Sequence, residues 1–451
     1  MRLNHNAMAY TAANNFSTIN QKVAASMARL SSGYKINKSS DDPTGKAISQ
    51  RMNAQIRGLK RAESNANDGI SLIQTAEGAL NEEHSILGRM RELAVQAANE
   101  TYDETDRDSI QAEIKQLQEE LDRISDTTQF NGRALLNGEL NRKGYTDGDT
   151  VKIAEIGGDV DAGDYRITIT TLGTSARVTT NPITGDYTGE PGAITINGMS
   201  VTVSKGMTMA EIQESLCNEA NKIGIDYDIT TGEFKSQEAG LSQKIEVKAD
   251  NDDLKALLGV PVSANGTDAQ ATFGANRIGF SDTATIQTDG NRVTVSDKDG
   301  FKMVFDAQAT GDANVTILTA GPMVIQVGGN EGQTLNINID KTTANSLGVD
   351  KIYMYTHEYA SEAIDKIDAA IVKISRIRSS LGAYENRMDY TSENIETQNE
   401  NLTSAVSRIL DTDMADEITE YTQQNILSQS AMQMLTKANA FPEGLLQLFQ
   451  R

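Results

Sequence analysis

Residues 52–97 contain the longest regular pattern of the sequence and read MNAQIRGLKRAESNANDGISLIQTAEGALNEEHSILGRMRELAVQA. Apolar side chains recur there at every seventh position, at Met52, Leu59, Ala66, Ile73, Leu80, Leu87 and Ala94. The position three residues further on holds Ala62, Gly69, Ala76, Met90 and Ala97. This heptad pattern predicts one helix from about residue 44 to 99, roughly 80 Å long. A helix with one apolar stripe must pack that stripe on a partner.

Two further seams supply partners. The first has spacings of four and three residues and precedes the turn FNG at 130–132; it consists of Ile110, Ile114, Leu117, Leu121 and Ile124. The second has a spacing of seven and consists of Ile367, Ile374, Leu381, Met388, Ile395, Leu402 and Ile409. We therefore expect an antiparallel hairpin of the first two helices, and one helical rod built from both halves of the chain.

Between these seams the period changes from seven to two. AITINGMSVTV at 193–203 alternates around Asn197-Gly198, which is a strong hairpin signal. Further strands are predicted at 165–172 and 291–306, a short helix at about 207–222, and a hairpin at 323–339. The predicted fold class is α+β: a long, discontinuous coiled-coil rod built from both termini, with a β-rich domain inserted in the middle.

The two ends of the chain form a third layer. An amphipathic helix is predicted at about 3–32, with Phe16, Ile19, Val23, Met27 and Leu30, and another at about 414–438, with Ile418, Tyr421, Met432 and Leu435. Each stripe is too narrow for a core, so we expect a coiled pair packed against copies of itself. The last residues, NAFPEGLLQLFQR at 439–451, add Leu445, Leu446, Leu448 and Phe449. Burying each is worth roughly 1.5–3 kcal/mol, so we expect a partner surface to receive them.

The seams and the change of period divide the chain into three domains. Residues 1–43 and 407–451 form a terminal coiled-coil domain, and 44–143 with 320–406 form a helical rod domain with a β-hairpin. Residues 144–319 form a β-rich outer domain.

Composition excludes several partner classes. The 451 residues include 63 acidic and 41 basic side chains, a formal net charge of −22, which repels phosphate backbones and anionic lipids. We therefore expect neither a nucleic-acid nor a membrane partner. No run of 18 apolar residues exists, and the first residues lack the apolar core of a secretory signal peptide. The single cysteine, Cys217, lies in the predicted short helix, and we expect it to pack as a small hydrophobe.

Candidate chemistry has a simpler structural explanation at each position. The histidines His5, His84 and His357 are scattered, and HEYAS at 357–361 lacks the second histidine of a zinc motif. Asp residues at 41, 42, 411 and 413 precede predicted helices and fit N-caps. We expect no cofactor, no metal and no enzymatic activity.

At this point the chain resembles the bacterial flagellins. The motifs that carry the resemblance occur in the family's order: RLSSGYKINKSSDDPTGKAIS at 29–49, RMRELAVQAANETY at 89–102, DSIQAEI at 108–114, IQVGGNEGQTLNI at 325–337, IRSSLGAYENRM at 377–388, DTDMADE at 411–417 and the last 13 residues. The match covers about 1–140 and 320–451, and the insert fits only in position.

The resemblance implies an extracellular, self-assembling filament subunit whose termini coil together in an inner tube. It implies that the four apolar residues of the tail are buried against neighbouring subunits, and that the chain leaves the cell through a type III export channel without a cleaved signal peptide. It further implies an export chaperone, a filament cap and hook-junction proteins as partners. Identical subunits in a non-closing arrangement give a helical filament.

The resemblance also implies contact with an innate immune receptor of the Toll-like class through Arg89, Leu93 and Glu113. Arg89 and Leu93 are one helical turn apart, and Glu113 comes from the facing helix. The alternative is that Leu93 and Arg91 serve only packing and charge pairing in the rod.

Two alternatives to a purely structural filament subunit remain open. The first is the related hook–filament junction protein, which shares the terminal helices; the full block PEGLLQLFQR favours the filament. The second is a filament subunit whose insert binds glycans or host surfaces as an adhesin, rather than setting only surface properties and packing.

Overall fold

The computed structural model describes residues 6–157, 160–274, 277–298, 301–318 and 321–449, with side chains up to residue 441 at the carboxyl end. The chain divides into two compact units. Unit 1 holds Met1–Asn67, Gln326–Thr334 and Met388–Arg451, and unit 2 holds Asp68–Ile325 and Leu335–Arg387. Two long helices contribute one part to each unit.

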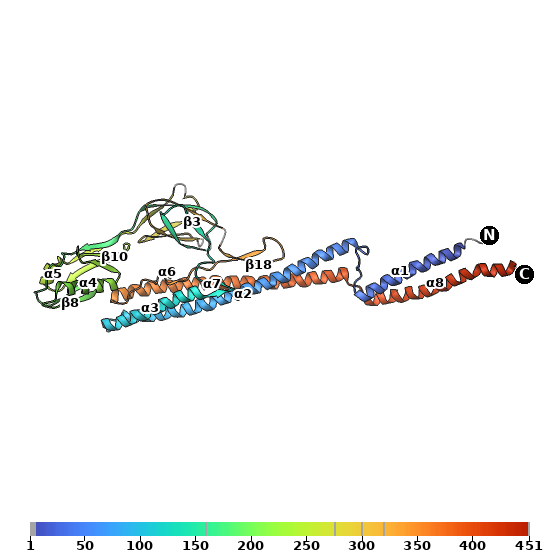
Figure 1. Cartoon of the computed structure of the whole chain (residues 1–451), viewed down its shortest axis with the longest axis horizontal. Coiled ribbons are helices and arrows are strands. Elements are labelled where there is room, and N and C mark those ends of the chain that lie inside the picture. The colour runs from blue at the N-terminus through green and yellow to red at the C-terminus, as the bar shows by residue number, and fades with distance from the viewer. Residues whose placement is uncertain (1–5, 158–159, 275–276, 299–300, 319–320, 450–451) are drawn as a thin grey trace. The chain divides into compact units, whose positions relative to one another are not determined.

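The described part of the chain has eight α-helices, and the sequence predicted all of them except the two short ones at 252–258 and 344–347. The eight helices are α1 (Ala7–Ser32), α2 (Pro43–Ala97), α3 (Glu104–Thr127), α4 (Met209–Lys222), α5 (Asp252–Leu258), α6 (Ala344–Leu347), α7 (His357–Leu410) and α8 (Met414–Phe449) (Figure 1). The last helix is longer than the predicted 414–438, because its backbone continues through the apolar tail.

Local capping sets the bounds of α2 and α3. The Asp42 carboxylate accepts hydrogen bonds from the backbone N–H groups of Thr44 (3.0 Å) and Gly45 (2.9 Å), and proline occupies the first helical position. Asp103 caps α3 in the same way, through the N–H of Asp106 at 2.8 Å. The guanidinium of Arg107 donates to the carbonyl of Ala97 at 3.1 Å, which holds the turn between the two helices closed.

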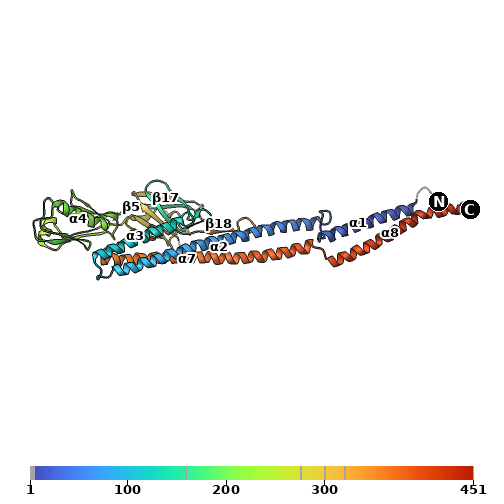
Figure 2. The same cartoon turned by 60° about the horizontal axis from the view of Figure 1, so that its bottom comes forward.

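In unit 2, α2, α3 and α7 form a three-helix bundle. Helices α2 and α7 run antiparallel, because Gln74 bonds Glu385 at 2.9 Å while Arg91 pairs with Asp368 at 2.6 Å (Figure 2). Their facing side chains are fully buried, as Leu80 shows with 0% exposure. The predicted antiparallel hairpin and the rod built from both halves of the chain are therefore both present.

In unit 1, the start of α2 packs against the end of α7. Leu59, Ala62 and Ile395 form a small apolar cluster there, with Leu402 beside it. The tip of the hairpin formed by β18 (Met323–Gln326) and β19 (Thr334–Ile337) covers this region, and Asn65 donates to the carbonyl of Gln326 at 3.0 Å. A second two-stranded hairpin, β1 (Gln129–Phe130) with β2 (Arg133–Ala134), follows α3 in unit 2 and contains the predicted FNG turn.

The insert contains two hydrophobic cores. The first lobe consists of two antiparallel four-stranded sheets, β13-β5-β17-β3 and β14-β15-β16-β4. Its strands are β3 (Gly144–Thr146), β4 (Val151–Ile156), β5 (Gly163–Thr171), β13 (Gln270–Phe273), β14 (Thr285–Asp289), β15 (Arg292–Ser296), β16 (Lys302–Ala307) and β17 (Gly311–Ile317). Alternate residues of these strands, such as Tyr165, Ile167 and Ile169, point into the core.

The second lobe is inserted between β5 and β13 of the first. It contains the sheets β6-β10-β9 and β12-β11-β7-β8, covered by α4 and α5. Its strands are β6 (Ser175–Thr179), β7 (Gly192–Ile196), β8 (Met199–Val203), β9 (Ile225–Asp228), β10 (Glu233–Ala239), β11 (Lys244–Ala249) and β12 (Val262–Asn265). The predicted turn at Asn197-Gly198 has positive φ at both residues, 45° and 87°, as a tight hairpin turn requires. Cys217 packs against this core, as expected.

Candidate functional site

The terminal helices α1 and α8 form an antiparallel pair within unit 1. The Asn6 amide donates to the carbonyl of Ala438 at 2.8 Å, and the Ser428 hydroxyl donates to Asn20 at 2.8 Å. Both views show the two helices side by side (Figures 1 and 2). The first and last parts of the chain therefore meet along their length, as the sequence predicts.

The centre of this pair is polar. In the described part of the two helices, the buried side chains are Ser26 (0% exposed) and Glu417 (7% exposed). The Ser26 hydroxyl donates to the Glu417 carboxylate, whose other oxygen lies 3.0 Å from the Arg29 guanidinium. Glu420 lies 3.8 Å from the same guanidinium, at its exposed side. We call these four residues the polar lock.

The polar lock keeps Glu417 charged. Burial alone would raise the pKa of this carboxyl, but the bonds from Arg29 and Ser26 outweigh that effect and lower the pKa. The hydrogen bond to Glu417 likewise raises the pKa of Arg29. A buried charge with its partners in place fixes the register of a helix pair, whereas removing one partner leaves the other charge uncompensated.

The connection between α1 and α2 is hydrogen-bonded to the connection between α7 and α8 in unit 1, and we call this point the crossover. Gly33 ends α1 in the left-handed conformation, with φ of 73°. The N–H of Lys35 then donates to the carbonyl of Leu410 at 2.7 Å, and the N–H of Thr412 donates to the carbonyl of Gly33 at 3.0 Å. Asp413 caps α8 through the N–H of Ala415 at 2.9 Å. Of the four aspartates predicted to fit N-caps, Asp42 and Asp413 therefore cap the starts of α2 and α8.

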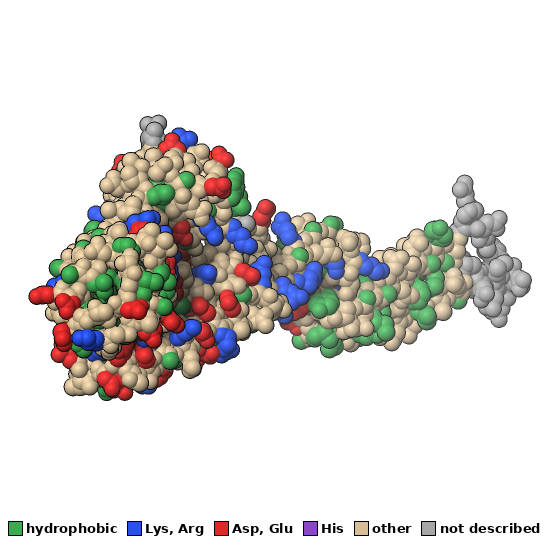
Figure 3. Space-filling view, turned by 60° about the vertical axis from the view of Figure 1, so that its left-hand side comes forward, with side chains coloured by type: hydrophobic (Ala, Val, Ile, Leu, Met, Phe, Trp, Pro, Cys, Tyr) green, Lys and Arg blue, Asp and Glu red, His purple; other side chains and the backbone are tan. Residues whose placement is uncertain are grey.

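The outward faces of the pair carry many large apolar side chains. In the described part of α1 and α8, the large hydrophobic side chains that are more than two-fifths exposed are Met8, Tyr10, Met27, Met414, Ile418, Ile426, Leu427, Met432, Met434 and Phe441. An open groove of about 580 Å³ runs between the two helices, lined by residues that include Met8, Ile19 and Met434. Figure 3 shows hydrophobic side chains on the surface of this helix pair. An apolar surface of this extent, exposed in the single chain, indicates an interface that another protein surface covers.

The predicted terminal residues divide between two faces. Phe16, Ile19, Val23, Leu30, Tyr421 and Leu435 are half-buried, whereas Met27, Ile418 and Met432 are more than half exposed. Leu445, Leu446, Leu448 and Phe449 lie outside the residues whose side chains the structure describes.

The predicted rod-seam residues lie along the helical parts of both units. Twelve of them are buried: Leu59, Ile73, Leu80, Leu87, Ile110, Ile114, Leu121, Ile367, Ile374, Leu381, Met388 and Ile395. The remaining five are half-buried: Met52, Leu117, Ile124, Leu402 and Ile409.

A buried acid interrupts the bundle seam. Glu83 is 0% exposed and accepts a hydrogen bond from the Thr342 hydroxyl at 2.8 Å, while its other oxygen has no partner among the described residues. Burial raises its pKa to about 8. The sequence carries a signal for this residue, because the series Ala62, Gly69, Ala76, Met90 skips position 83. The polar lock has a similar signal, since Ser26 lies on the apolar stripe of α1.

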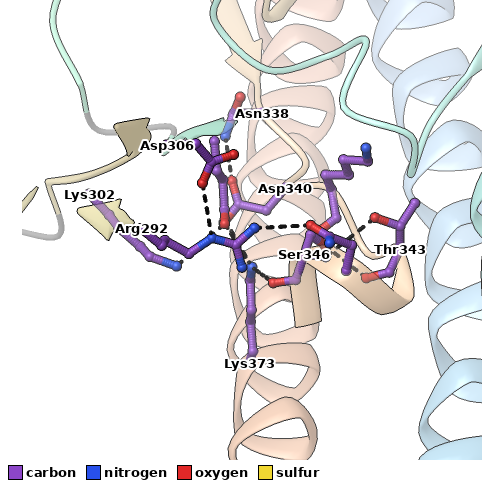
Figure 4. A network of polar contacts seen from close by, with 11 residues as sticks. Arg292, Lys302, Asp306, Asn338, Asp340, Thr343, Ser346 and Lys373 are labelled. Carbon is purple, nitrogen blue, oxygen red and sulfur yellow. Dashed lines mark hydrogen bonds and ion pairs between the residues drawn. The ribbon is translucent and has the colours of Figure 1, made fainter. Parts of the chain in front are cut away.

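A second polar network joins the first lobe to α7 (Figure 4). The Lys373 ammonium lies 2.9 Å from the Glu155 carboxylate of β4 and donates to the carbonyl of Ser346 at 2.8 Å. Burial lowers the pKa of Lys373, and burial followed by the charge of Glu155 raises that of Asp340 beside it. This network anchors the lobe to the bundle, and no spacing in the sequence indicates it.

The predicted receptor-contact residues lie close together in unit 2. The Arg89 guanidinium pairs with Glu113 at 2.8 Å, and their side chains are 50% and 43% exposed. Leu93 is 2% exposed and packs inside the bundle. Arg91 pairs with Asp368. Leu93 and Arg91 thus have the packing and charge-pairing roles considered from the sequence.

The described ranges lack the features of two further kinds of site. No group of three or more His, Cys, Asp or Glu side chains there is arranged to hold a metal ion. None of the helices, over the same residues, combines the length and hydropathy needed to cross a lipid bilayer.

A rod of long helices whose paired termini leave an apolar face open is the architecture of a subunit that completes its core by self-assembly. Comparison with known proteins identifies the family. Residues 3–141 match the bacterial flagellin N-terminal helical region, and residues 364–449 match the bacterial flagellin C-terminal helical region. The chain belongs to the bacterial flagellins and is a structural subunit of the flagellar filament.

Relatives match over almost the whole chain. A flagellin of Clostridium tyrobutyricum is 37% identical over 445 residues, covering 97% of this chain and 99% of the relative. A flagellin of Salmonella typhimurium is 32% identical and covers 99% of each. Among solved structures, FliC from Burkholderia pseudomallei is 17% identical with a TM-score of 0.25, covering 71% of this chain and 99% of that one.

Proposed function

We propose that copies of this chain join into the filament through the apolar face of α1 and α8. One observation carries this proposal: large apolar side chains on these two helices, such as Met8 (67% exposed) and Met434 (66%), are not covered by any of the described residues. Each would gain roughly 1.5–3 kcal/mol on full burial between subunits.

A double substitution tests the face directly. Ile426→Gln with Met434→Gln replaces two exposed apolar side chains by polar ones that keep a similar length and helix propensity. We expect the concentration needed for filament formation to rise at least tenfold, with the monomer's circular dichroism unchanged. Leu241→Gln, at a 62% exposed position of the second lobe, is the matched control and should assemble like the parent. Normal assembly of the double variant would contradict the proposal.

The tail is tested separately by truncation. We propose that Leu445, Leu446, Leu448 and Phe449 are buried between subunits, as the family resemblance implies. A chain ending at Ala440 should form no long filaments in electron micrographs under conditions in which the full chain does. If both chains form filaments, the tail has another role.

For the organisation of the filament we propose three domains with the predicted bounds. Residues 1–43 and 407–451 would line the inner tube, 44–143 and 320–406 would form the rod around it, and 144–319 would form the outer domain. The crossover at Gly33 and Thr412 supports the first boundary, since both terminal helices separate there from the rod helices.

We propose that the chain reaches the extracellular filament by type III export, without a cleaved signal peptide. An export chaperone would cover the apolar face of the terminal pair before assembly, and cap and hook-junction proteins would bind the same face at the filament ends. The role would be structural, without catalysis. Mass spectrometry of the exported protein should find its amino-terminal sequence intact; a shortened amino terminus would contradict this route.

We further propose that a Toll-like receptor recognises the exposed pair of Arg89 and Glu113. Leu93, which packs inside the bundle, would hold this part of α2 in position. The half-exposed side chains of the pair favour this surface. Arg89→Ala should lower receptor stimulation more than tenfold, while Arg91→Ala, which removes a neighbouring ion pair, should not. Equal stimulation by Arg89→Ala and the parent would overturn the proposal.

A further inference from the structure

A polar cleft of about 610 Å³ lies in unit 2, where the second lobe meets the first turns of α7. One wall contains the β7–β8 turn at Asn197-Gly198 and parts of β10 and β11. The other wall is formed by residues 351–366, before and within α7. Its volume is in the usual range for sites that hold a small ligand. Filament assembly through α1 and α8 makes no use of this cleft.

Tyrosine rings in the wall of the cleft are held by ring contacts and a hydrogen bond. Tyr353 stacks on Tyr355 with ring centres 6.5 Å apart and meets Tyr359 edge to face at 6.1 Å. The Asn197 amide donates to the Tyr359 hydroxyl at 2.9 Å. Tyr353 and Tyr359 line the cleft and are half-buried, and burial raises the pKa of both hydroxyls. These hydroxyls stay protonated at neutral pH and the rings are held in place, so they offer flat apolar faces with neutral polar tips.

The cations of the cleft are already paired. Lys351 pairs with Glu238, Lys244 and Lys248 both pair with Glu246, and Lys366 pairs with Glu362. Lys244 and Lys248 share one carboxylate, but the described lining holds four lysines and five glutamates, so its formal net charge is −1.

Two carboxylates of the lining stand apart from these pairs. The side chains of Glu100 and Glu358 line the cleft and are exposed, and neither makes a hydrogen bond or an ion pair with another described side chain. The cleft thus presents free acceptors and an excess of negative charge.

This balance decides the class of ligand. A phosphate or sulfate group needs unpaired cations or clustered N–H donors, and a fatty or aromatic ligand needs a mainly apolar lining. A sugar ring has one face of C–H groups and a rim of hydroxyls, which suits an aromatic face beside free carboxylates. We propose that this cleft binds a neutral oligosaccharide, with a sugar ring against Tyr353 and its hydroxyls donating to Glu100 and Glu358.

The proposal is tested by calorimetric titration of the full-length monomer with four neutral trisaccharides: maltotriose, cellotriose, mannotriose and triacetylchitotriose. We expect at least one to bind, and Glu358→Gln to weaken that binding at least tenfold. Asp365→Asn changes an exposed carboxylate on the same helix outside the cleft and should bind like the parent. Binding by none of the four, or equal binding by Glu358→Gln and the parent, would overturn the proposal.

The ring is tested by a pair of substitutions. Tyr353→Phe keeps the aromatic face and should keep binding within about threefold, whereas Tyr353→Ala should abolish it. Saturation-transfer NMR should show contact between the tyrosine and the C–H face of the sugar in the parent. Thermal melts of each variant separate loss of the site from loss of the fold, and Glu358→Gln keeps the test decisive if Tyr353→Ala unfolds. The monomer is used throughout, so this outcome is independent of whether the filament surface is correctly assigned.

Discussion

The three-helix bundle of unit 2 and the terminal helix pair of unit 1 are built from the same kind of sequence, but they bury their apolar side chains to different extents. Both have apolar side chains at three- and four-residue spacings. In the bundle, Leu80 and Leu87 are 0% exposed. In the pair, Phe16 and Leu435 remain half exposed, and Met27 is 61% exposed. Three helices can enclose a seam, whereas two helices leave their outer faces in solvent.

Each region also contains one acid in its seam, and the two acids differ in charge state. Glu83 is buried with a single hydroxyl partner, and its pKa is raised to about 8. Glu417 is buried beside Arg29 and Ser26, and its pKa is lowered. The bundle therefore holds a neutral acid at moderate pH, and the pair holds an ionised one. The bundle is therefore stabilised within one chain. In the terminal pair, the polar lock fixes the register of α1 against α8, and other copies of the chain complete the hydrophobic core.

The largest effect is expected from a cavity in the bundle. Leu80→Ala removes a fully buried side chain, so the free energy of unfolding of unit 2 should fall by about 2–5 kcal/mol. Leu435→Ala is the matched change in the terminal pair and should cost under about 1 kcal/mol in the monomer, because that side chain is partly in water already. Urea unfolding of both variants measures this. Equal losses would erase the distinction between the two regions.

The buried acid of the bundle predicts a pH effect of about 3 kcal/mol. The unfolded carboxyl releases its proton near the ordinary pKa of 4.5, whereas the folded one keeps it to about 8. The folded state binds more protons in this window, so its stability falls as the pH rises from about 5 to 8. Glu83→Gln cannot ionise and should be more stable than the parent by about 3 kcal/mol at pH 7 and by nearly nothing at pH 4.

Glu82→Gln is the control for this measurement, since Glu82 is the exposed neighbour on the same helix. It should follow the parent at every pH. A parent protein whose unfolding free energy is flat between pH 5 and 8 would show that Glu83 is ionised in the fold.

A smaller effect is expected at the polar lock. Arg29→Ala leaves the buried Glu417 without its cation, so the terminal pair should lose about 1–2 kcal/mol. Hydrogen exchange of the α1 and α8 amides should detect the loss, and Lys22→Ala, an exposed change on α1, should not alter it. The lowered pKa of Glu417 also predicts a pH dependence. The polar lock stabilises the terminal pair above the pKa that this carboxyl has in the unfolded chain, and this stabilisation is lost as the pH falls through the pKa of the folded state. Unchanged hydrogen exchange in Arg29→Ala would show that the polar lock does not stabilise the terminal pair.

The smallest change in the monomer is expected at the exposed face. Met27→Gln alters a side chain that is 61% exposed and should shift monomer stability by less than about 0.5 kcal/mol. Its effect should appear only on assembly, as a higher concentration for filament formation. A variant that is destabilised as a monomer would place Met27 inside the chain's own core.

The sequence predicted those parts of the fold in which one local pattern determines the outcome. The seven-residue spacing of Leu80 and Leu87 located the bundle, and Asn197-Gly198 located a hairpin, because period and turn chemistry are properties of short segments. The split of the terminal stripes was not predicted, since Met27 and Val23 look alike in a heptad and only the partner helix decides which is covered. The Arg29–Glu417 and Lys373–Glu155 pairs join residues hundreds of positions apart, which a single sequence cannot match.

Hydrogen exchange of the monomer and of the assembled filament, followed by mass spectrometry, distinguishes a core completed by other copies from one completed within the chain. We predict that amides of α1 and α8 exchange rapidly in the monomer and at least a hundredfold more slowly in the filament. Amides of α2, α3 and α7 within unit 2 should be protected equally in both. Terminal helices that are already as protected in the monomer as the bundle would contradict the claim that copies of the chain complete their core.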